Sequence, residues 1–242
     1  MNFLISITIN VITVGFIIYG LIISKNKQIP LSDFVKSKFN KYSKIDIFIG
    51  ILIGFIAMLG IYLVELKLNF IQVKNTNNFN VKFIVTFCSL AVMALGEELL
   101  FRGFMLSGLM HILKNKYIAV LITAILFGLA HAGNPNATIV SIVSNGLGGV
   151  MYAIAFIESN SIWLPFGLHF AWNFFQGPIF GFPVSGIDFG GMIEQNPAVS
   201  QNLIYGGTYG PEGGIIGISF RILVILMLLL YYSFSIKKRN KS

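Results

Sequence analysis

The sequence predicts an all-α integral membrane protein, with one domain over residues 1–242 built as a polytopic bundle of seven to eight transmembrane helices. Composition is the first reason, because 55% of the residues are hydrophobic, only 11% are charged and the mean hydropathy is +0.80. A soluble domain of this size needs a charged surface that so few charges do not supply. The second reason is that the apolar residues form runs of about 20 residues, the length of helix that crosses ~30 Å of hydrocarbon.

Seven runs are long enough to be predicted as spans. They cover approximately residues 3–23, 45–65, 83–112, 117–133, 137–157, 161–180 and 215–236. The third run is long for one helix and the connection 181–214 is rich in Gly and Pro, so an eighth helix would lie in one of these two places. We expect residues 80–180 to hold the functional core, with the spans in 1–66 and 215–236 as accessory helices of the same bundle.

The positive charges predict an orientation. Twelve of the 17 Lys and Arg residues lie in Lys25–Lys44, Lys114–Lys116 and Lys237–Lys241, whereas the connection 181–214 has none. Basic loops of membrane proteins face the cytoplasm, so we expect a cytoplasmic C-terminus and an N-terminus outside. This bias explains the net charge of +8 without a nucleic acid partner, and it makes the lipid bilayer the expected contact of these segments.

Cysteine usage excludes some metal sites. Cys88 is the only cysteine, so the chain has no intrachain disulfide and no zinc site that needs two or more cysteines. Because Cys88 lies in an apolar run, we expect it to be a buried residue of the bundle.

Ionisable side chains inside the predicted spans are few. Each costs about 2.5–3.5 kcal/mol to insert, so such residues mark functional sites. The stretch "EELLFR" contains three of them, Glu97, Glu98 and Arg102. A helix brings Glu98 and Arg102, four residues apart, to one face, where they can form an ion pair. Glu97 points about 100° away and is left to face a cavity. An ion pair of this kind is often only structural, so its meaning depends on the other polar residues at this depth.

Two later runs add polar residues with helical spacing. His131 follows Phe127 by four residues on the fourth run, and His169 and Asn173 share one face of the sixth. Helix bundles build sites from side chains on facing helices. Three helices that offer a Glu, a His and a His–Asn pair therefore indicate an active site rather than separate interhelical hydrogen bonds.

The residue types narrow the chemistry of such a site. The zinc-protease pattern H-E-x-x-H is absent, and Asp188 lies outside the spans, so a paired-aspartate site has no candidate. Ser107 precedes His111 by four residues, but His111 lies near a helix end, and Ser144 is a weaker nucleophile candidate still. What remains is a desolvated glutamate that takes a proton from water, with histidines and an amide to hold the water and a developing oxyanion. That set is complete for hydrolysis of a peptide bond.

These residues make the sequence resemble the CPBP family of intramembrane proteases, which includes the type II CAAX prenyl endopeptidases and many bacterial Abi-type proteins. The family motifs E-E-x-x-x-R, F-x-x-x-H and H-x-x-x-N/D read here as "EELLFR", "FGLAH" and "HFAWN". They occur in order at family-like separations within residues 80–180, whereas the rest of the chain matches only in hydropathy. The resemblance implies an intramembrane endopeptidase that acts on peptides or proteins at the membrane.

The resemblance also implies a role for each motif residue. The general base on water is Glu97, supported by His131, and the oxyanion side is formed by His169 and Asn173. Three further residues support the site: Glu98 paired with Arg102, and Phe127 by packing.

A metal is an alternative. Members of the family have been described as metalloproteases, and Glu97, His131 and His169 would make a site of two histidines and one carboxylate for a divalent metal such as zinc. Because Glu and His suffice to activate water by acid–base chemistry, we favour hydrolysis without a cofactor.

Two other functional classes compete with the enzyme. A non-catalytic membrane binding or immunity protein, as in bacteriocin self-protection, would use the same polar cavity to hold a peptide. A proton-coupled transporter would use the Glu, His and Arg residues as a relay, although the sequence has no inverted repeat.

Overall fold

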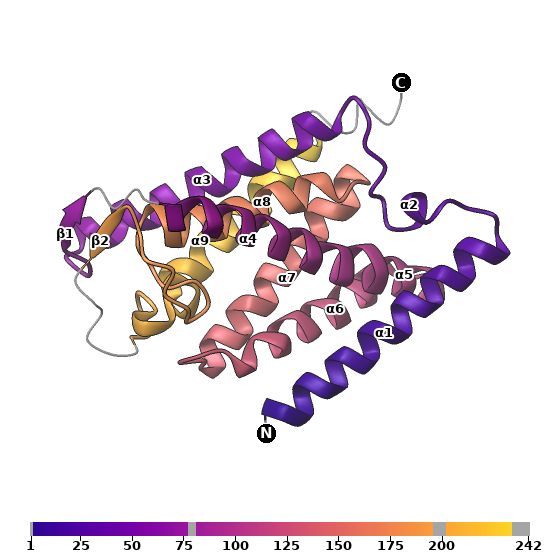
Figure 1. Ribbon diagram of the computed structural model, residues 1–242, viewed down its shortest axis with the longest axis horizontal. Helices are drawn as coiled ribbons and strands as arrows, with labels where there is room; N and C mark the ends of the chain where they lie inside the picture. The colour runs from indigo at the N-terminus through magenta and orange to yellow at the C-terminus, as the bar shows by residue number, and fades with distance from the viewer. Residues whose placement is uncertain (1, 77–80, 196–201, 234–242) are drawn as a thin grey trace.

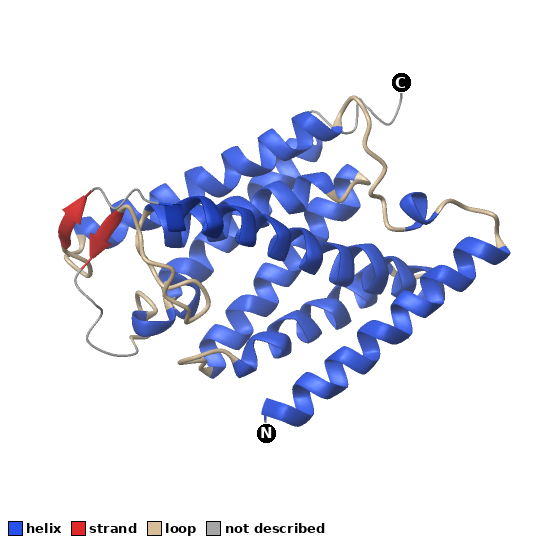
Figure 2. Cartoon of the chain, viewed as in Figure 1, coloured by secondary structure: helices blue, strands red, loops and turns tan. Residues whose placement is uncertain are grey.

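The computed structural model describes residues 2–76, 81–195 and 202–233, and it is mostly helical, as predicted (Figure 2). The basic segment Lys237–Lys241 and the last residues of the predicted run 215–236 lie outside the described residues. The α-helices are α1 (Asn2–Asn26), α2 (Leu31–Phe34), α3 (Ser43–Lys67), α4 (Val81–Glu98), α5 (Ser107–Leu113), α6 (Lys116–Ala130), α7 (Ile139–Ser159), α8 (Trp163–Phe174) and α9 (Ile215–Tyr231). Shorter elements are π-helical η1 (Leu99–Leu106) and η3 (Phe175–Ile179), 3₁₀-helical η2 (His131–Gly133), η4 (Gly207–Tyr209) and η5 (Pro211–Gly213), and strands β1 (Val73–Thr76) and β2 (Ile193–Gln195).

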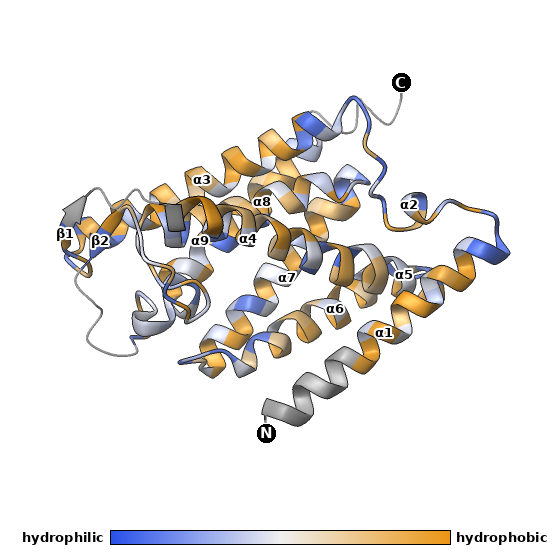
Figure 3. Ribbon diagram, in the orientation of Figure 1, coloured by the Kyte–Doolittle hydropathy of each residue, from blue (hydrophilic) through white to orange (hydrophobic). Residues whose placement is uncertain are grey.

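Four helical stretches among the described residues are long and apolar enough to cross a membrane. They are Ser43–Lys67, Phe83–Leu113, Lys116–Gly133 and Ile139–Ser159, which match four of the predicted runs. Two shorter apolar helices, Val11–Asn26 and Ile215–Tyr231, lie in the first and last runs. Figure 3 shows the apolar residues along these helices and polar residues in the connection between α1 and α3. The count of seven to eight spans stays a prediction.

The long third run forms one continuous helix in which α4, η1 and α5 follow each other without a break. An eighth helix is therefore not found there, and the described part of 181–214 contains β2, an isolated bridge between Val184 and Ile187 and short 3₁₀ turns, but no α-helix. Cys88 is exposed on α4, so the prediction of burial is wrong. The helix buries a different stripe, Leu90, Ala94 and Glu98, whose four-residue spacing leaves Cys88 outside it.

Helix α8 is the interior helix of the bundle. Nine of its twelve residues are buried, and it packs against α3, α4 and α7 (Figure 1). The backbones of α3 and α8 approach closely because glycines meet at the crossing. A Cβ on Gly50 would lie 2.5 Å from the Leu164 carbonyl oxygen, and one on Gly167 would collide with the backbone of Ile47. Such small-residue contacts are a common means of helix association in membranes.

Helices α6 and α7 form a second close pair. A Cβ on Gly149 would lie 2.9 Å from Cα of Ala124. The turn between the helices ends at Thr138, whose side chain accepts a hydrogen bond from the Ser141 amide in a capping box. This short turn places His131, at the end of α6, beside the start of α7.

The two ends of the bundle differ. At one end Lys27 lies 2.8 Å from Nε2 of His111, and Tyr19 lies 2.6 Å from its Nδ1, so the end of α1 meets α5. At the other end β1 pairs antiparallel with β2 and forms a two-stranded sheet that the sequence did not predict (Figure 1).

The substitution Gly50→Ala tests the α3–α8 contact. Its methyl group has no room against the α8 backbone, so we expect a destabilisation of about 1–3 kcal/mol, measured by thermal unfolding of the purified protein in detergent. The control is Gly15→Ala in α1, where nothing lies within 4 Å of the new Cβ and stability should stay the same or rise. Equal effects of the two substitutions would contradict the packing argument.

Candidate active site

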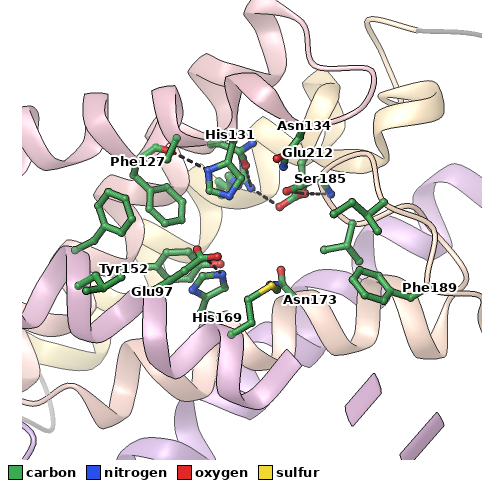
Figure 4. A pocket seen from close by; sticks show the side chains of 18 of the residues that line it. Glu97, Phe127, His131, Asn134, Tyr152, His169, Asn173, Ser185, Phe189 and Glu212 are labelled. Carbon is green, nitrogen blue, oxygen red and sulfur yellow. Dashed lines mark hydrogen bonds and ion pairs between the residues drawn. The ribbon is translucent and has the colours of Figure 1, made fainter. Parts of the chain in front are cut away.

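A cavity of about 280 Å³ lies between α4, η1, α6, α7, α8 and α9, and the segment 184–189 and η5 close it on another side (Figure 4). The four residues predicted as catalytic, Glu97, His131, His169 and Asn173, all line this cavity. The predicted supporting residue Phe127 lines it as well. The structure therefore brings together side chains from three helices that lie up to 76 positions apart in the sequence, the distance from Glu97 to Asn173.

Oε1 of the buried Glu98 is the shared partner of Arg102 and His169. Nη1 of Arg102 donates to Oε1 of Glu98 at 2.9 Å, so the predicted ion pair is present. Nδ1 of His169 lies 2.8 Å from the same oxygen. Because an ionised carboxylate only accepts, Nδ1 carries the proton in this contact and Nε2 is left for another partner. Glu98 thereby ties α8 to α4 and sets the orientation of the imidazole.

Glu97 occupies a different environment from Glu98. Its side chain is 27% exposed, and its Oε2 lies 3.9 Å from Nε2 of His169, too far for a direct hydrogen bond. This Oε2 has no hydrogen-bond partner among the described residues. The two adjacent glutamates thus differ as the helical spacing predicts: one is held in an ion pair and the other faces the cavity.

Aromatic rings form one wall of the site. The Phe127 ring lies 4.4 Å from the Arg102 guanidinium carbon and 4.7 Å from the His131 ring. Tyr152 stacks on His169 with ring centroids 4.5 Å apart and an angle of 17°. Tyr152 was not among the site residues predicted from the sequence. Its signal is its position three residues after Gly149, on the glycine face with which α7 approaches α6.

His131 and Asn173 complete the predicted set. Nδ1 of His131 lies 2.8 Å from the Phe127 carbonyl oxygen, an acceptor, so Nδ1 carries a proton and Nε2 is available. Figure 4 shows His131 across the cavity from Glu97 and His169, on the side of Glu212. Asn173 lies one turn beyond His169 on α8, with its side chain at the cavity.

A second buried ion pair, which was not among the predicted site residues, borders the cavity. Nη2 of Arg221 on α9 donates to Glu212 at 2.8 Å and to Asn145 on α7 at 3.0 Å. The other oxygen of Glu212 accepts from both the backbone amide and the hydroxyl of Ser185, each at 2.7 Å. Arg221 lies in a mostly apolar last span and therefore needs a carboxylate partner. Glu212, nine residues earlier in the sequence, could have been recognised as that partner.

Glu212 is held as a carboxylate. Burial of the side chain acts to raise the pKa of Glu212, but the charge of Arg221 and the hydrogen bonds from Ser185 outweigh it, so that this pKa lies below its usual 4.5. His131 acts in the same direction as Arg221. The folded protein therefore gains stability from ionised Glu212 above pH 4.5 and loses it as the pH falls below that value.

The site does not have the arrangement of a metal centre. Within residues 2–76, 81–195 and 202–233, no three His, Cys, Asp or Glu side chains converge closely enough to hold a metal ion. In particular, the side chains of Glu97, His131 and His169 do not converge in this way. The residues present do not fit the metal site considered from the sequence.

Comparison with known proteins agrees with the motifs. The model of a family described as type II CAAX prenyl endopeptidase Rce1-like matches residues 79–175, which include every motif residue. This match is consistent with the CPBP family of proteases and confirms the resemblance stated from the motifs. No curated protein and no solved structure matches the chain. The family match indicates a membrane peptidase, whose substrate is a peptide or protein.

The substitution Glu212→Gln tests the second ion pair. It leaves the buried Arg221 without its anion, so we expect a loss of about 3–5 kcal/mol at pH 7. The difference from the unmodified protein should shrink as the pH falls below 4.5, because protonated Glu212 then resembles Gln. Thermal unfolding between pH 3.5 and 8 measures both effects. The control is Glu194→Gln, which breaks an exposed pair with Lys74 and should have little effect. A difference that is independent of pH would contradict this account of Glu212.

Proposed function

With residues 79–175 matched to the Rce1-like type II CAAX prenyl endopeptidase family, we propose that this protein is an intramembrane endopeptidase that hydrolyses peptide bonds of membrane-associated peptides or proteins. The single observation that carries the proposal is the contrast between Glu97 and Glu98. Glu97 lines the cavity, and its Oε2 has no partner among the described residues. Glu98, in contrast, has no exposed surface, and its Oε1 is held by both Arg102 and His169.

Glu97 is the general base. A water molecule in the cavity gives its proton to Glu97 as its oxygen attacks the carbonyl carbon of the scissile bond. The lack of any hydrogen bond to Oε2 among the described side chains supports this role, because a buried acceptor needs a donor and water supplies it. The proton then passes from Glu97 to the leaving amine, which restores the carboxylate and completes the hydrolysis.

His131 holds the same water. The Phe127 carbonyl accepts from Nδ1, which fixes the ring and leaves Nε2 to accept a hydrogen bond. Its place across the cavity from Glu97 (Figure 4) supports a water bound between the two side chains.

The opposite side of the carbonyl is held by α8. The amide of Asn173 donates to the oxygen that becomes negative in the tetrahedral intermediate. When both ring nitrogens of His169 carry a proton, Nδ1–H continues to donate to Glu98. Nε2–H then donates to the oxygen of the tetrahedral intermediate. The fixed contact of Nδ1 with Glu98 and the stack on Tyr152 support this role, since a donor that is already oriented does not reorganise during the reaction.

The substrate enters a site bordered by apolar helices, which supports a membrane-embedded or membrane-attached segment as the substrate. The orientation that accompanies this proposal is the one expected from the basic segments, with the N-terminus outside and the C-terminus in the cytoplasm. The family description does not by itself make the substrate prenylated.

The substitution Glu97→Gln tests the base. It keeps the shape of the side chain and removes the proton acceptor, so hydrolysis should fall at least about 100-fold with unchanged expression and thermal stability. The measurement compares membrane proteomes of cells that carry the unmodified protein, Glu97→Gln or Glu97→Ala, and seeks a peptide that accumulates uncleaved. Asp33→Asn, which removes a negative charge on α2, is the control and should cleave normally.

A non-catalytic binding or immunity protein gives the opposite result. Its protective effect in cells would survive Glu97→Gln, and no cleavage product would depend on Glu97. That outcome would reject the enzyme.

Because the side chains do not converge for a metal, we expect hydrolysis to be independent of one. Elemental analysis of the purified protein should find less than one equivalent of zinc or another divalent metal, and treatment with 1,10-phenanthroline or EDTA should leave hydrolysis unchanged. Loss of hydrolysis on chelation, with recovery on addition of zinc, would contradict this expectation.

A further inference from the structure

A second cavity, of about 370 Å³, lies at the end of the bundle that carries the two-stranded sheet. It is bordered by the last turn of α3, the segment 181–183, β2 and the stretch 205–208. Three acidic residues line it, Glu65, Asp188 and Glu194, and among the described residues no Lys or Arg does. We call it the acidic cavity.

Glu65 is the unusual member. Its side chain is 1% exposed, and neither of its carboxylate oxygens has a hydrogen-bond partner among the described residues. The other two carboxylates are engaged: Glu194 pairs with Lys74 at 3.2 Å, and Asp188 accepts from the Gly190 amide at 2.8 Å. An ionised carboxylate buried without a partner is costly, so a cation that entered the cavity would stabilise the ionised form of Glu65.

The chemistry of the walls favours an organic cation over a metal ion. No three acidic, His or Cys side chains converge for a metal anywhere in the described chain. A guanidinium or ammonium group, in contrast, needs one carboxylate and gains from aromatic rings. Tyr205, which stacks on Phe70 with ring centroids 5.0 Å apart, and Phe182 supply such rings at this cavity.

The acidic cavity adjoins the candidate active site. Pro183 and Asp188 line the acidic cavity, whereas Val184, Ser185 and Phe189, from the same short segment, line the active-site cavity. One stretch of chain thus separates the two cavities. A substrate held in the active-site cavity would therefore have to pass this segment for one of its side chains to reach the acidic cavity. The connection 181–214 has no Lys or Arg, and Lys74 on β1 is already paired with Glu194.

We propose that the acidic cavity is a subsite for a basic side chain, Lys or Arg, of the peptide substrate, with Glu65 as its anion. The subsite rests on the proposed function for its role in hydrolysis, but its affinity for a cation is independent of catalysis. It would select substrates with a basic residue at a fixed distance from the cleaved bond.

Binding of small probes tests the cavity directly. The full-length protein in detergent is titrated with Nα-acetyl-arginine amide and with Nα-acetyl-citrulline amide, which has the same shape and no charge, and binding is followed by calorimetry. We expect the arginine compound to bind at least 10-fold more tightly than the citrulline compound. Glu65→Gln should abolish this preference, whereas Asp33→Asn, on α2 at the other end of the bundle, should retain it. Should Glu65→Gln fail to fold, Asp188→Asn, which removes an exposed charge at the rim, should weaken arginine binding severalfold.

Several outcomes would overturn the subsite. These are equal binding of the two probes, no binding of either, equal arginine binding by Glu65→Gln, or a Glu65-dependent response to Ca²⁺ or Mg²⁺ in place of arginine.

A peptide mixture tests the role in hydrolysis. Synthetic peptides of varied sequence are incubated with the protein in liposomes, and cleaved bonds are identified by mass spectrometry. We expect Lys or Arg to be enriched at one fixed position in the cleaved peptides, and the enrichment to disappear in Glu65→Gln while cleavage continues. Cleavage without basic enrichment would reject the subsite and retain the protease. Arginine binding by both the unmodified protein and Glu97→Gln, with no cleavage by either, would reject the protease and retain the cation-binding cavity.

Discussion

The arrangement of the site depends on a single buried oxygen, Oε1 of Glu98, which contacts both Arg102 and His169. Three ionisable groups stay inside an apolar bundle because each satisfies another, and removal of one member would leave an uncompensated charge that costs about 3–5 kcal/mol. Arg102 also donates to the Gly149 carbonyl at 3.3 Å. The contact therefore joins the α4–η1 helix, α7 and α8 at one point, and the orientation of His169 follows from it.

The same contact separates the roles of two adjacent glutamates. Glu98 has no exposed surface, whereas Glu97 reaches the cavity, because successive residues of a helix point in different directions. The π-helical turn that begins directly after Glu98 carries Arg102, and such turns are frequent at functional sites. One helix can therefore carry a carboxylate that is held in an ion pair beside one that stays available at the cavity.

The Glu212–Arg221 pair holds the connection 181–214 against the bundle, as Glu98 holds the helices together. Through Ser185 it ties this connection to α9, and through Asn145 to α7. The segment held in this way is also the wall between the active-site cavity and the acidic cavity. The hydrogen bonds of Glu212 thus hold in place the segment that separates the cavity with the motif residues from the acidic cavity.

The sequence by itself determined the apolar helices, their approximate ends and the residues of the motif, because hydropathy and helical spacing are local properties. Glu97, Glu98, Arg102, His131, His169 and Asn173 were all found in this way, and the structure brings them to one place. Only the tertiary structure decided which residues that are far apart in the chain contact each other. Arg221 meets Ser144 across 77 positions, Tyr152 stacks on His169, and β1 pairs with β2. The burial of Glu65 and the exposure of Cys88 were decided there too. No local pattern records which side of a helix another helix covers, or where a Gly- and Pro-rich connection folds back.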